Sequence, residues 1–418
     1  MRLFSWAKRA PAHDKRAIAL DIGTEFVKAL IFEVDGLSAK VVGVGKQRQR
    51  LADMQGGTVT DIHGVIENCE AALERAAEQA NYLPDQTIVG IAGELVKGTT
   101  TTIKYVRPEP LAKITGEELQ EILGRVQNRA HDRAKALLAW ETGQAEIDVR
   151  LVNAAIVDVR IDGYKVTNPL GFQGREVQVG IYSAFAPIVH LGALQTIAEE
   201  LSLDLLSVAA EPYAVARITG PEESSEFSAI FIDVGGGTTD LAVVNNGGLI
   251  GTKMFALGGR AFTKRIMNTF GTTFAEAEAR KLDYTAGKLD KKDETATKEA
   301  LATDVDVWLS GIELTLSEFT NVDLLPSRIL LCGGGSNLPE ISEALKEATW
   351  GKHLPFARKP LIHFLKPSEI STVQDITGEL KTVQDITPMA LANLAIELVG
   401  RSTVGDRVVQ RVVGSLRV

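Results

Sequence analysis

The sequence has little cysteine and histidine and no long apolar run, and each shortage excludes a class of protein. Cys69 and Cys332 are too few for a disulfide framework or a zinc site, and the six histidines show no metal-ligand spacing. No apolar run reaches the roughly 20 residues that a membrane-spanning helix needs, and the N-terminus lacks the pattern of a secretory signal. A net charge of −9 argues against general affinity for nucleic acid. We therefore expect a soluble, cytoplasmic chain.

Two stretches far apart in the chain repeat one plan. Residues 16–34, RAIALDIGTEFVKALIFEV, and residues 229–247, AIFIDVGGGTTDLAVVNNG, each place an apolar strand before an Asp, glycine and threonine, and then a second apolar strand. Each stretch is typical of a β-hairpin whose glycines supply positive φ at the turn. Since Asp21 and Asp233 are 212 positions apart, each would begin its own half of the chain. The sequence predicts duplicated lobes that face each other.

The hairpin tips have the chemistry of a phosphate site. Small residues let backbone N–H groups approach an anion closely, and threonine hydroxyls add donors. The carboxylates of Asp21 and Asp233 beside a phosphate are tolerable only with a hydrated divalent cation among them, and Mg²⁺ binds through few carboxylates and keeps its waters. One such turn is more often an ordinary hairpin. Two in register predict a nucleotide site.

A third glycine run follows another apolar strand, in SRILLCGGGSNLPEISEAL at residues 327–345. Alone it would be an ordinary strand-to-helix turn. The dinucleotide pattern GxGxxG fails here, because Leu338 stands three positions after Gly335, and the sequence contains no GxxxxGK[ST] loop. A nucleotide site in this chain must therefore be built in another way.

Together these motifs resemble the signatures of the actin and heat-shock chaperone ATPase superfamily, two phosphate hairpins and a later glycine-rich adenosine turn. Within it the sequence is most similar to the bacterial cell-division protein FtsA. VGVGKQ, GGTVTDI and TIVGIAG in the first hundred residues, VTNPLGFQG at 166–174, and LGGRAFTKRI and AEARKL further on follow in the FtsA order. The likeness runs from about Ala17 to Leu398.

The resemblance implies an α/β, two-lobed actin-like (ribonuclease H-like) ATPase fold with a small inserted α+β subdomain in the first lobe. In the insert, Thr115 and Glu118 form a predicted capping box at the start of a helix. The expected segments are an N-terminal basic and apolar segment (1–16), the first lobe (17–98 and 178–220), the insert (99–177), the second lobe (227–398) and a C-terminal amphipathic helix (399–418).

The resemblance also assigns roles to single residues. Asp21 and Asp233 would hold hydrated Mg²⁺, and Glu211, in AAEPYAVA, would orient the attacking water, although it also suits the start of a helix. Glu278 and Lys281 match the ribose contacts or form an ion pair within one helix. Asp240 either faces the site or caps its own turn. The phosphates and adenosine of ATP would lie among Gly23, Thr24, Gly235, Gly236, Gly237, Thr238, Thr239, Gly333, Gly334, Gly335 and Ser336.

The two ends of the chain suggest contact with a membrane. In residues 401–418, valines and Leu416 fall on one helical face and arginines on the other, which suits an anionic bilayer surface. FtsA proteins resemble this in ending with a membrane-targeting helix. The N-terminal MRLFSWAKRA offers Phe4 and Trp6 beside basic residues as a second or principal anchor. Either end would otherwise pack on protein.

The resemblance implies an FtsA-like protein that binds ATP, hydrolyses it slowly at most, assembles into filaments and tethers the tubulin-like division protein FtsZ to the inner face of the cell membrane. Two alternatives stay open. One is a PilM-like scaffold for type IV pilus assembly, which would accept a partner peptide. The other is a sugar or acetate kinase of the same superfamily, which would need an acid or base aimed at its substrate. Neither FtsA nor these alternatives requires nucleic acid.

Overall fold

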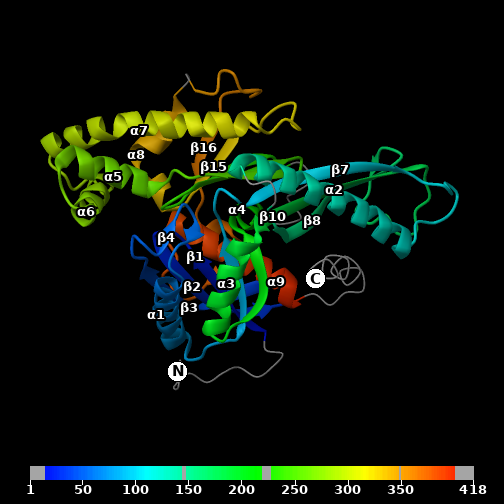
Figure 1. The fold of residues 1–418 in the computed structure, drawn as a ribbon, viewed down its shortest axis with the longest axis horizontal. Coiled ribbons are helices and arrows are strands. Elements are labelled where there is room, and N and C mark those ends of the chain that lie inside the picture. Colours follow the sequence, from blue (N-terminus) through cyan, green and yellow to red (C-terminus); the bar gives the residue numbers. More distant parts are fainter. Residues whose placement is uncertain (1–14, 144–146, 219–226, 348–349, 401–418) are drawn as a thin grey trace.

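The computed structural model describes residues 15–143, 147–218, 227–347 and 350–400. The described chain forms two lobes with an extension to one side (Figure 1). Of the two terminal segments predicted to contact a membrane, 1–16 and 399–418, residues 1–14 and 401–418 lie outside the described residues. Within the described part, no helix combines the length and apolarity that crossing a bilayer requires.

The first lobe is built on a six-stranded mixed sheet. Its order is β11-β6-β1-β2-β3-β17, with β1 antiparallel to β2 and parallel to β6. Helices α1 and α3 contact each other on this sheet. Helix α9 packs on the central strands of the sheet and also contacts α4. The strands are β1 (Arg16–Ile22), β2 (Phe26–Asp35), β3 (Ser38–Arg48), β6 (Gln86–Ile91), β11 (Asp204–Ala210) and β17 (Val373–Asp375), and the helices are α1 (Ile62–Ala80), α3 (Ile188–Glu200), α4 (Glu211–Ala216) and α9 (Ile386–Gly400).

The second lobe and the insert share a nine-stranded sheet of order β16-β15-β12-β13-β14-β7-β10-β8-β9. The last four of these strands and helix α2 form the extension in Figure 1. The second-lobe elements are β12 (Ala229–Val234), β13 (Thr239–Asn245), β14 (Gly248–Phe255), β15 (Arg328–Cys332), β16 (Leu361–Phe364), α5 (Gly259–Phe270), α6 (Phe274–Thr285), α7 (Lys291–Ser317) and α8 (Pro339–Lys346), and those of the insert are β7 (Lys97–Val106), α2 (Gly116–Thr142), β8 (Val149–Ile161), β9 (Tyr164–Lys165) and β10 (Glu176–Pro187). Two short strands, β4 (Met54–Gln55) and β5 (Thr58–Val59), pair by themselves.

The end of the described chain returns to the first lobe. β17 pairs with β3, and α9 packs against β1, β2 and β6. Buried residues of α9, including Ile386 and Met389, belong to the apolar core of the first lobe. The sequence-based boundary of the second lobe, 227–398, is therefore corrected, because the residues from about Ile370 onward complete the first lobe.

The predicted helix of the insert begins where the sequence indicates. Thr115 is the N-cap of α2, and its hydroxyl accepts a hydrogen bond from the Glu118 N–H at 3.2 Å. The second half of the predicted capping box is different. The Glu118 carboxylate instead accepts two bonds, at 2.7 and 2.9 Å, from buried Arg107, whose guanidinium also donates to the carbonyl of Gly174 in the NPLGFQG segment. This segment therefore holds the insert's loops to its helix.

Two glycines in VGVG allow α1 to lie directly on β3. A Cβ atom on Gly45 would lie 1.8 Å from the Ala72 carbonyl oxygen, and one on Gly43 would lie 2.2 Å from that of Ala76. We expect Gly45→Ala to lower the free energy of unfolding by about 1–3 kcal/mol, because the helix must move away from the strand.

Gly124→Ala provides the control, measured in parallel by urea unfolding. Gly124 lies inside α2 with no atom within 4 Å of its added Cβ, so alanine there should be neutral or stabilising by up to about 1 kcal/mol. Equal stability of Gly45→Ala and the wild type would contradict the close contact between α1 and β3.

Candidate functional site

The two predicted hairpins have the same local geometry and meet at their tips. In each, a glycine N–H donates to the carbonyl three residues later, from Gly23 to Phe26 at 3.1 Å and from Gly235 to Thr238 at 2.9 Å. A Cβ atom on Gly236 would lie 2.8 Å from the Glu25 Cβ. The tips approach this closely only because side chains are missing from one of them.

The third glycine turn lies against the second hairpin. β15 runs parallel to β12 and places Cys332 beside Asp233. Gly333 follows with φ of +80°, and an added Cβ would lie 2.0 Å from the Asp233 Oδ1 atom. Both the left-handed backbone and the lack of space require glycine at this position.

The three turns surround one cavity of about 300 Å³ between the lobes, a volume at the lower end of the range for small-molecule sites. Most of the residues predicted for the site line it. These are Asp21, Gly23, Thr24, Glu211, Asp233, Gly235, Gly236, Thr238, Glu278, Lys281, Gly333, Gly334 and Gly335.

Four buried carboxylates line this cavity, those of Asp21, Glu211, Asp233 and Asp240. The other charged residues that line it form the pairs Glu25–Arg260 and Glu278–Lys281. Among the described residues, Lys28 is thus the one lining cation outside these pairs, and its ammonium donates to Asp21 Oδ2 at 3.0 Å. Ionised, the group holds three more negative than positive charges, an arrangement that favours binding of a cation.

The pKa values show how costly this gathering of charge is. Burial, and then the charges of Asp21, Asp240 and Asp233, raise the pKa of Glu211 well above its usual range. Burial and the neighbouring Asp233 likewise raise the pKa of Asp240. Burial alone would lower the pKa of Lys28, but the Asp21 carboxylate, with Asp233 further away, raises it. The folded environment therefore makes Glu211 and Asp240 weaker acids than their model compounds.

Glu211 reaches the site because the opposite strand leaves room for it. The residue begins α4, directly after β11. A Cβ atom on Gly90, in the adjacent strand β6, would lie 2.7 Å from Glu211 Oε1. The EPYA segment and the TIVGIAG segment therefore cooperate in placing one carboxylate.

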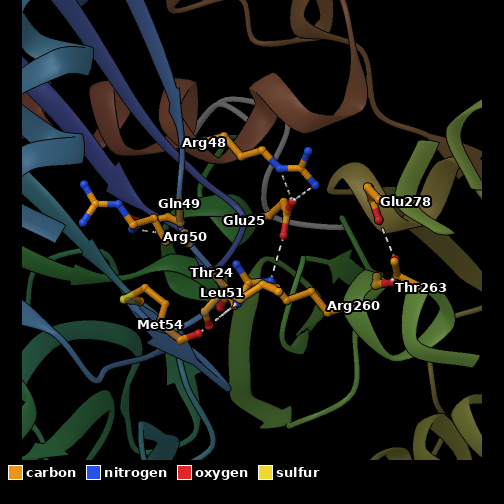
Figure 2. A network of polar contacts seen from close by, with 12 residues as sticks. Thr24, Glu25, Arg48, Gln49, Arg50, Leu51, Met54, Arg260, Thr263 and Glu278 are labelled. Carbon is orange, nitrogen blue, oxygen red and sulfur yellow. Dashed lines mark hydrogen bonds and ion pairs between the residues drawn. The ribbon is translucent and has the colours of Figure 1, made fainter. Parts of the chain in front are cut away.

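Glu278 and Lys281 confirm one interpretation of the sequence, an ion pair within one helix, while the ribose contact stays a prediction. They form an ion pair at 2.8 Å, and Lys281 also donates to the Thr263 hydroxyl at 2.7 Å and to the Gly259 carbonyl at 3.0 Å. Thr263 in turn donates to the Glu278 carboxylate (Figure 2). The cluster lines the second-lobe side of the cavity as a preorganised polar surface.

Three predicted residues do not line the cavity. The Thr239 hydroxyl donates to the Leu257 carbonyl at 2.7 Å and accepts from the Trp308 indole at 3.0 Å. The Ser336 hydroxyl donates to the Gly333 carbonyl at 2.7 Å and is fully buried. Gly237 packs on Thr24, and a Cβ atom added to Gly237 would lie 2.7 Å from Thr24 Oγ1. These residues shape the turns and leave the cavity wall to their neighbours.

Sequence reasoning missed several residues of the wall, among them Lys28, Gln384 and Thr387. The sequence did contain a signal for Lys28. It follows Asp21 by seven positions in the adjacent antiparallel strand of the hairpin, where the two residues are direct cross-strand partners. Gln384 accepts from Lys28 through its carbonyl at 2.8 Å, and the Thr387 hydroxyl donates to Asp233 Oδ2. Both belong to the second copy of the TVQDIT hexamer, at 382–387.

The comparisons with known proteins agree with these motifs. The family model "Cell division protein FtsA" matches residues 230–377. The predicted resemblance to FtsA is confirmed. FtsA of Pseudomonas aeruginosa is 25% identical over 355 residues, covering 80% of this chain and 81% of that protein. FtsA of Bacillus subtilis is 23% identical over 344 residues, covering 78% and 74%.

A solved structure of a PilM-PilN type IV pilus biogenesis complex shares the fold. It matches with a TM-score of 0.61 and 18% identity over 92% of this chain and 98% of that one. The predicted two-lobed actin-like α/β fold is therefore confirmed.

The donor set fits a hydrated cation better than a directly ligated one. Among the described residues, no three His, Cys, Asp or Glu side chains come close enough together to hold a metal ion directly. The four carboxylates nevertheless carry uncompensated charge, and one buried oxygen, Asp240 Oδ1, has no hydrogen-bond partner. Mg²⁺ commonly keeps several waters and uses few carboxylates, so the site fits Mg²⁺ held through its waters.

The negative charge of the four carboxylates can be tested at Asp240. The protein is kept free of divalent ions by a chelator. Because the pKa of Asp240 is raised on folding, the protonated carboxyl contributes stability below the unfolded-state pKa of about 4, and this stability is lost as pH rises through the folded-state pKa. Asp240→Asn cannot ionise, so its melting temperature should rise relative to the wild type between about pH 5 and pH 8.

Asp132→Asn, at a side chain that is 85% exposed, serves as the control and should follow the wild type at every pH. A constant difference between Asp240→Asn and the wild type across the same range would show that Asp240 carries no such buried charge.

Proposed function

We propose that the protein binds Mg·ATP between its lobes, and the observation that carries this is the convergence of two phosphate-type hairpins and a glycine turn on one acidic cavity. Backbone N–H groups of the tips and the hydroxyls of Thr24 and Thr238 would receive the phosphates. Asp21 and Asp233 would hold the hydrated cation, and Lys28 would add a charge toward the phosphates.

The remaining parts of the cavity suit the rest of the nucleotide. Glu278 and Lys281 present polar groups to the ribose, and Gly333–Gly335 leave an open surface for the adenosine, with Leu338 as an apolar neighbour. Both polar and apolar residues therefore line the cavity.

Glu211 is the proposed catalytic residue. Its carboxylate would orient a water for in-line attack on the terminal phosphate, which is the main demand that phosphoryl transfer makes on a protein. The raised pKa of Glu211 also suits a group that takes up the proton of that water. We expect hydrolysis to be slow and its main role to be the control of lobe closure.

At the level of the cell, we propose an FtsA-like role in division. The similarity to curated FtsA proteins over most of the chain supports it. In this role, ATP-bound subunits assemble head to tail into filaments and bind an FtsZ-like division protein. The amphipathic segment 399–418, with 1–16 as a second anchor, attaches them to the cytoplasmic face of the membrane.

The insert is the proposed contact between subunits. It projects away from both lobes (Figure 1) and exposes apolar side chains near its outer loops, among them Leu111 at 85% and Phe172 at 48%. A contiguous patch of such side chains would suit contact with a neighbouring subunit.

A PilM-like scaffold is the second candidate, and one observation favours it. A groove of about 410 Å³ lies between β8, α3 and the edge strand β11, with apolar walls from Leu151, Ile188 and Leu206 and the charge of Arg150 at its side. An extended partner peptide fits such a groove.

Two substitutions test the nucleotide site. Asp233→Ala should weaken Mg²⁺-dependent ATP binding at least about tenfold, because the cation loses a carboxylate. Glu211→Ala should leave binding intact and lower hydrolysis by about 100-fold or more, because it acts only in the chemical step. Calorimetry and phosphate release measure the two effects. Unchanged affinity in Asp233→Ala would remove the site assignment, and normal turnover in Glu211→Ala would leave that residue a structural role.

Assembly and membrane attachment are tested together by electron microscopy on an anionic lipid monolayer. With ATP, the full chain should form filaments there and recruit added FtsZ. Removing residues 401–418 should reduce binding to the lipid, and so should high salt, because basic residues contribute the attraction. Leu111→Glu should bind lipid and ATP but form no filaments. ATP binding without filaments in the intact protein would favour the pilus scaffold.

A further inference from the structure

Arg260 connects the two lobes at the mouth of the cavity. It lies in the first turn of α5, in the second lobe, and its Nε donates to Glu25 Oε2 at 2.7 Å. Its Nη1 donates to the carbonyls of Met54 at 2.9 Å and Leu51 at 3.4 Å. All three acceptors belong to the first lobe (Figure 2).

The backbone of Arg260 is fixed as firmly as its side chain. Its N–H donates to the Gly236 carbonyl at 2.8 Å, which ties it to the tip of the second hairpin. Its side chain binds Glu25, at the tip of the first. One residue therefore spans both phosphate-type tips, and these tips cannot separate while its bonds remain.

The link is shielded from water. The Arg260 and Glu25 side chains are only 11% and 16% exposed, so the ion pair is much less screened than a surface pair. Arg260 Nη2 is buried and has no hydrogen-bond partner, and Arg260 is one of the residues that line the cavity. Arg48 also binds Glu25, at 2.7 Å, but from β3 of the same lobe, so it orients Glu25 without crossing the cleft.

We infer that Arg260 is an interlobe latch that holds the cavity mouth closed and sets the rate at which nucleotide leaves. This inference rests on the proposed nucleotide site. A ligand held between the hairpin tips can leave only when the lobes part, and parting breaks three charge-assisted bonds. Arg260 is a positioning residue, since it acts on the lobes and takes no part in the chemical step.

The first experiment measures lobe opening without nucleotide. Spin labels are placed by Glu78→Cys on α1 and Glu299→Cys on α7, exposed positions in opposite lobes, while both native cysteines are buried. Arg260→Ala should lengthen or broaden the distance distribution between the labels. Arg265→Ala should not, because Arg265 lies on the same helix but pairs with Asp304 inside the second lobe at 2.9 Å.

The second experiment measures release of a fluorescent ATP analogue by stopped flow. Arg260→Ala should accelerate release at least about tenfold, since hydrogen bonds of charged groups are strong enough for such an effect. Arg265→Ala should change it less than about twofold, and Arg48→Ala should fall between them. Arg260→Lys keeps the charge and one bond, so it should restore part of the slow release and show that the effect is not misfolding.

The outcomes separate the latch from the nucleotide site. Wild-type distances and wild-type release in Arg260→Ala would overturn the latch and leave ATP binding untouched. If the intact protein binds no ATP, the proposed function fails, and the distance measurement alone then decides whether Arg260 holds the lobes together. Equal effects of Arg260→Ala and Arg265→Ala would assign the result to general destabilisation of α5 and would also overturn the latch.

Discussion

The concentration of negative charge between the lobes constrains the rest of the structure. Three of the four carboxylates stand in strands β1, β12 and β13, and the fourth, that of Glu211, directly follows the edge strand β11. Lys28 pairs with Asp21. Burying like charges is unfavourable unless they are paired, protonated or bound to a cation. The raised pKa values of Glu211 and Asp240, caused first by burial and then by neighbouring carboxylates, show that ionising these groups is unfavourable here. A ligand that brings a cation would relieve this repulsion.

The end of the described chain, from Gln384 through α9, forms hydrogen bonds that connect the two lobes. Thr387 lies in the first turn of α9, a helix that packs in the first lobe. Its hydroxyl nevertheless donates to Asp233 of the second lobe. Gln384 binds Lys28 through its carbonyl and Lys46, at 2.6 Å, through its side chain. Gln384, Thr387 and Arg260 all line the cavity, so the returning end of the chain and α5 each link the lobes beside it.

The motifs that depend on local chemistry could be predicted, and those that depend on long-range packing could not. Asp21, Asp233 and the glycines after them could be predicted because an apolar strand followed by aspartate and glycine is typical of a tight turn. The two TVQDIT copies show the limit. In the first, Val373–Asp375 form strand β17, while in the second, Val383–Asp385 form a 3₁₀ turn that leads into α9. Identical hexamers take different structures because their neighbours differ, and only the second copy supplies Gln384 and Thr387 to the site.

The insert is attached to both lobes, and this links the cavity to the molecule's outer surface. Its chain enters from β6 and leaves into α3, both in the first lobe, but β7 pairs with β14 of the second at Gly251 and Thr252. This junction is tight, since a Cβ on Gly98 would lie 2.1 Å from the Thr252 hydroxyl oxygen. β14 continues through β13 to the second hairpin tip. The sheet of the insert continues into the second lobe, while its chain ends connect to the first. We therefore expect a change in the angle between the lobes to alter the direction in which the insert projects.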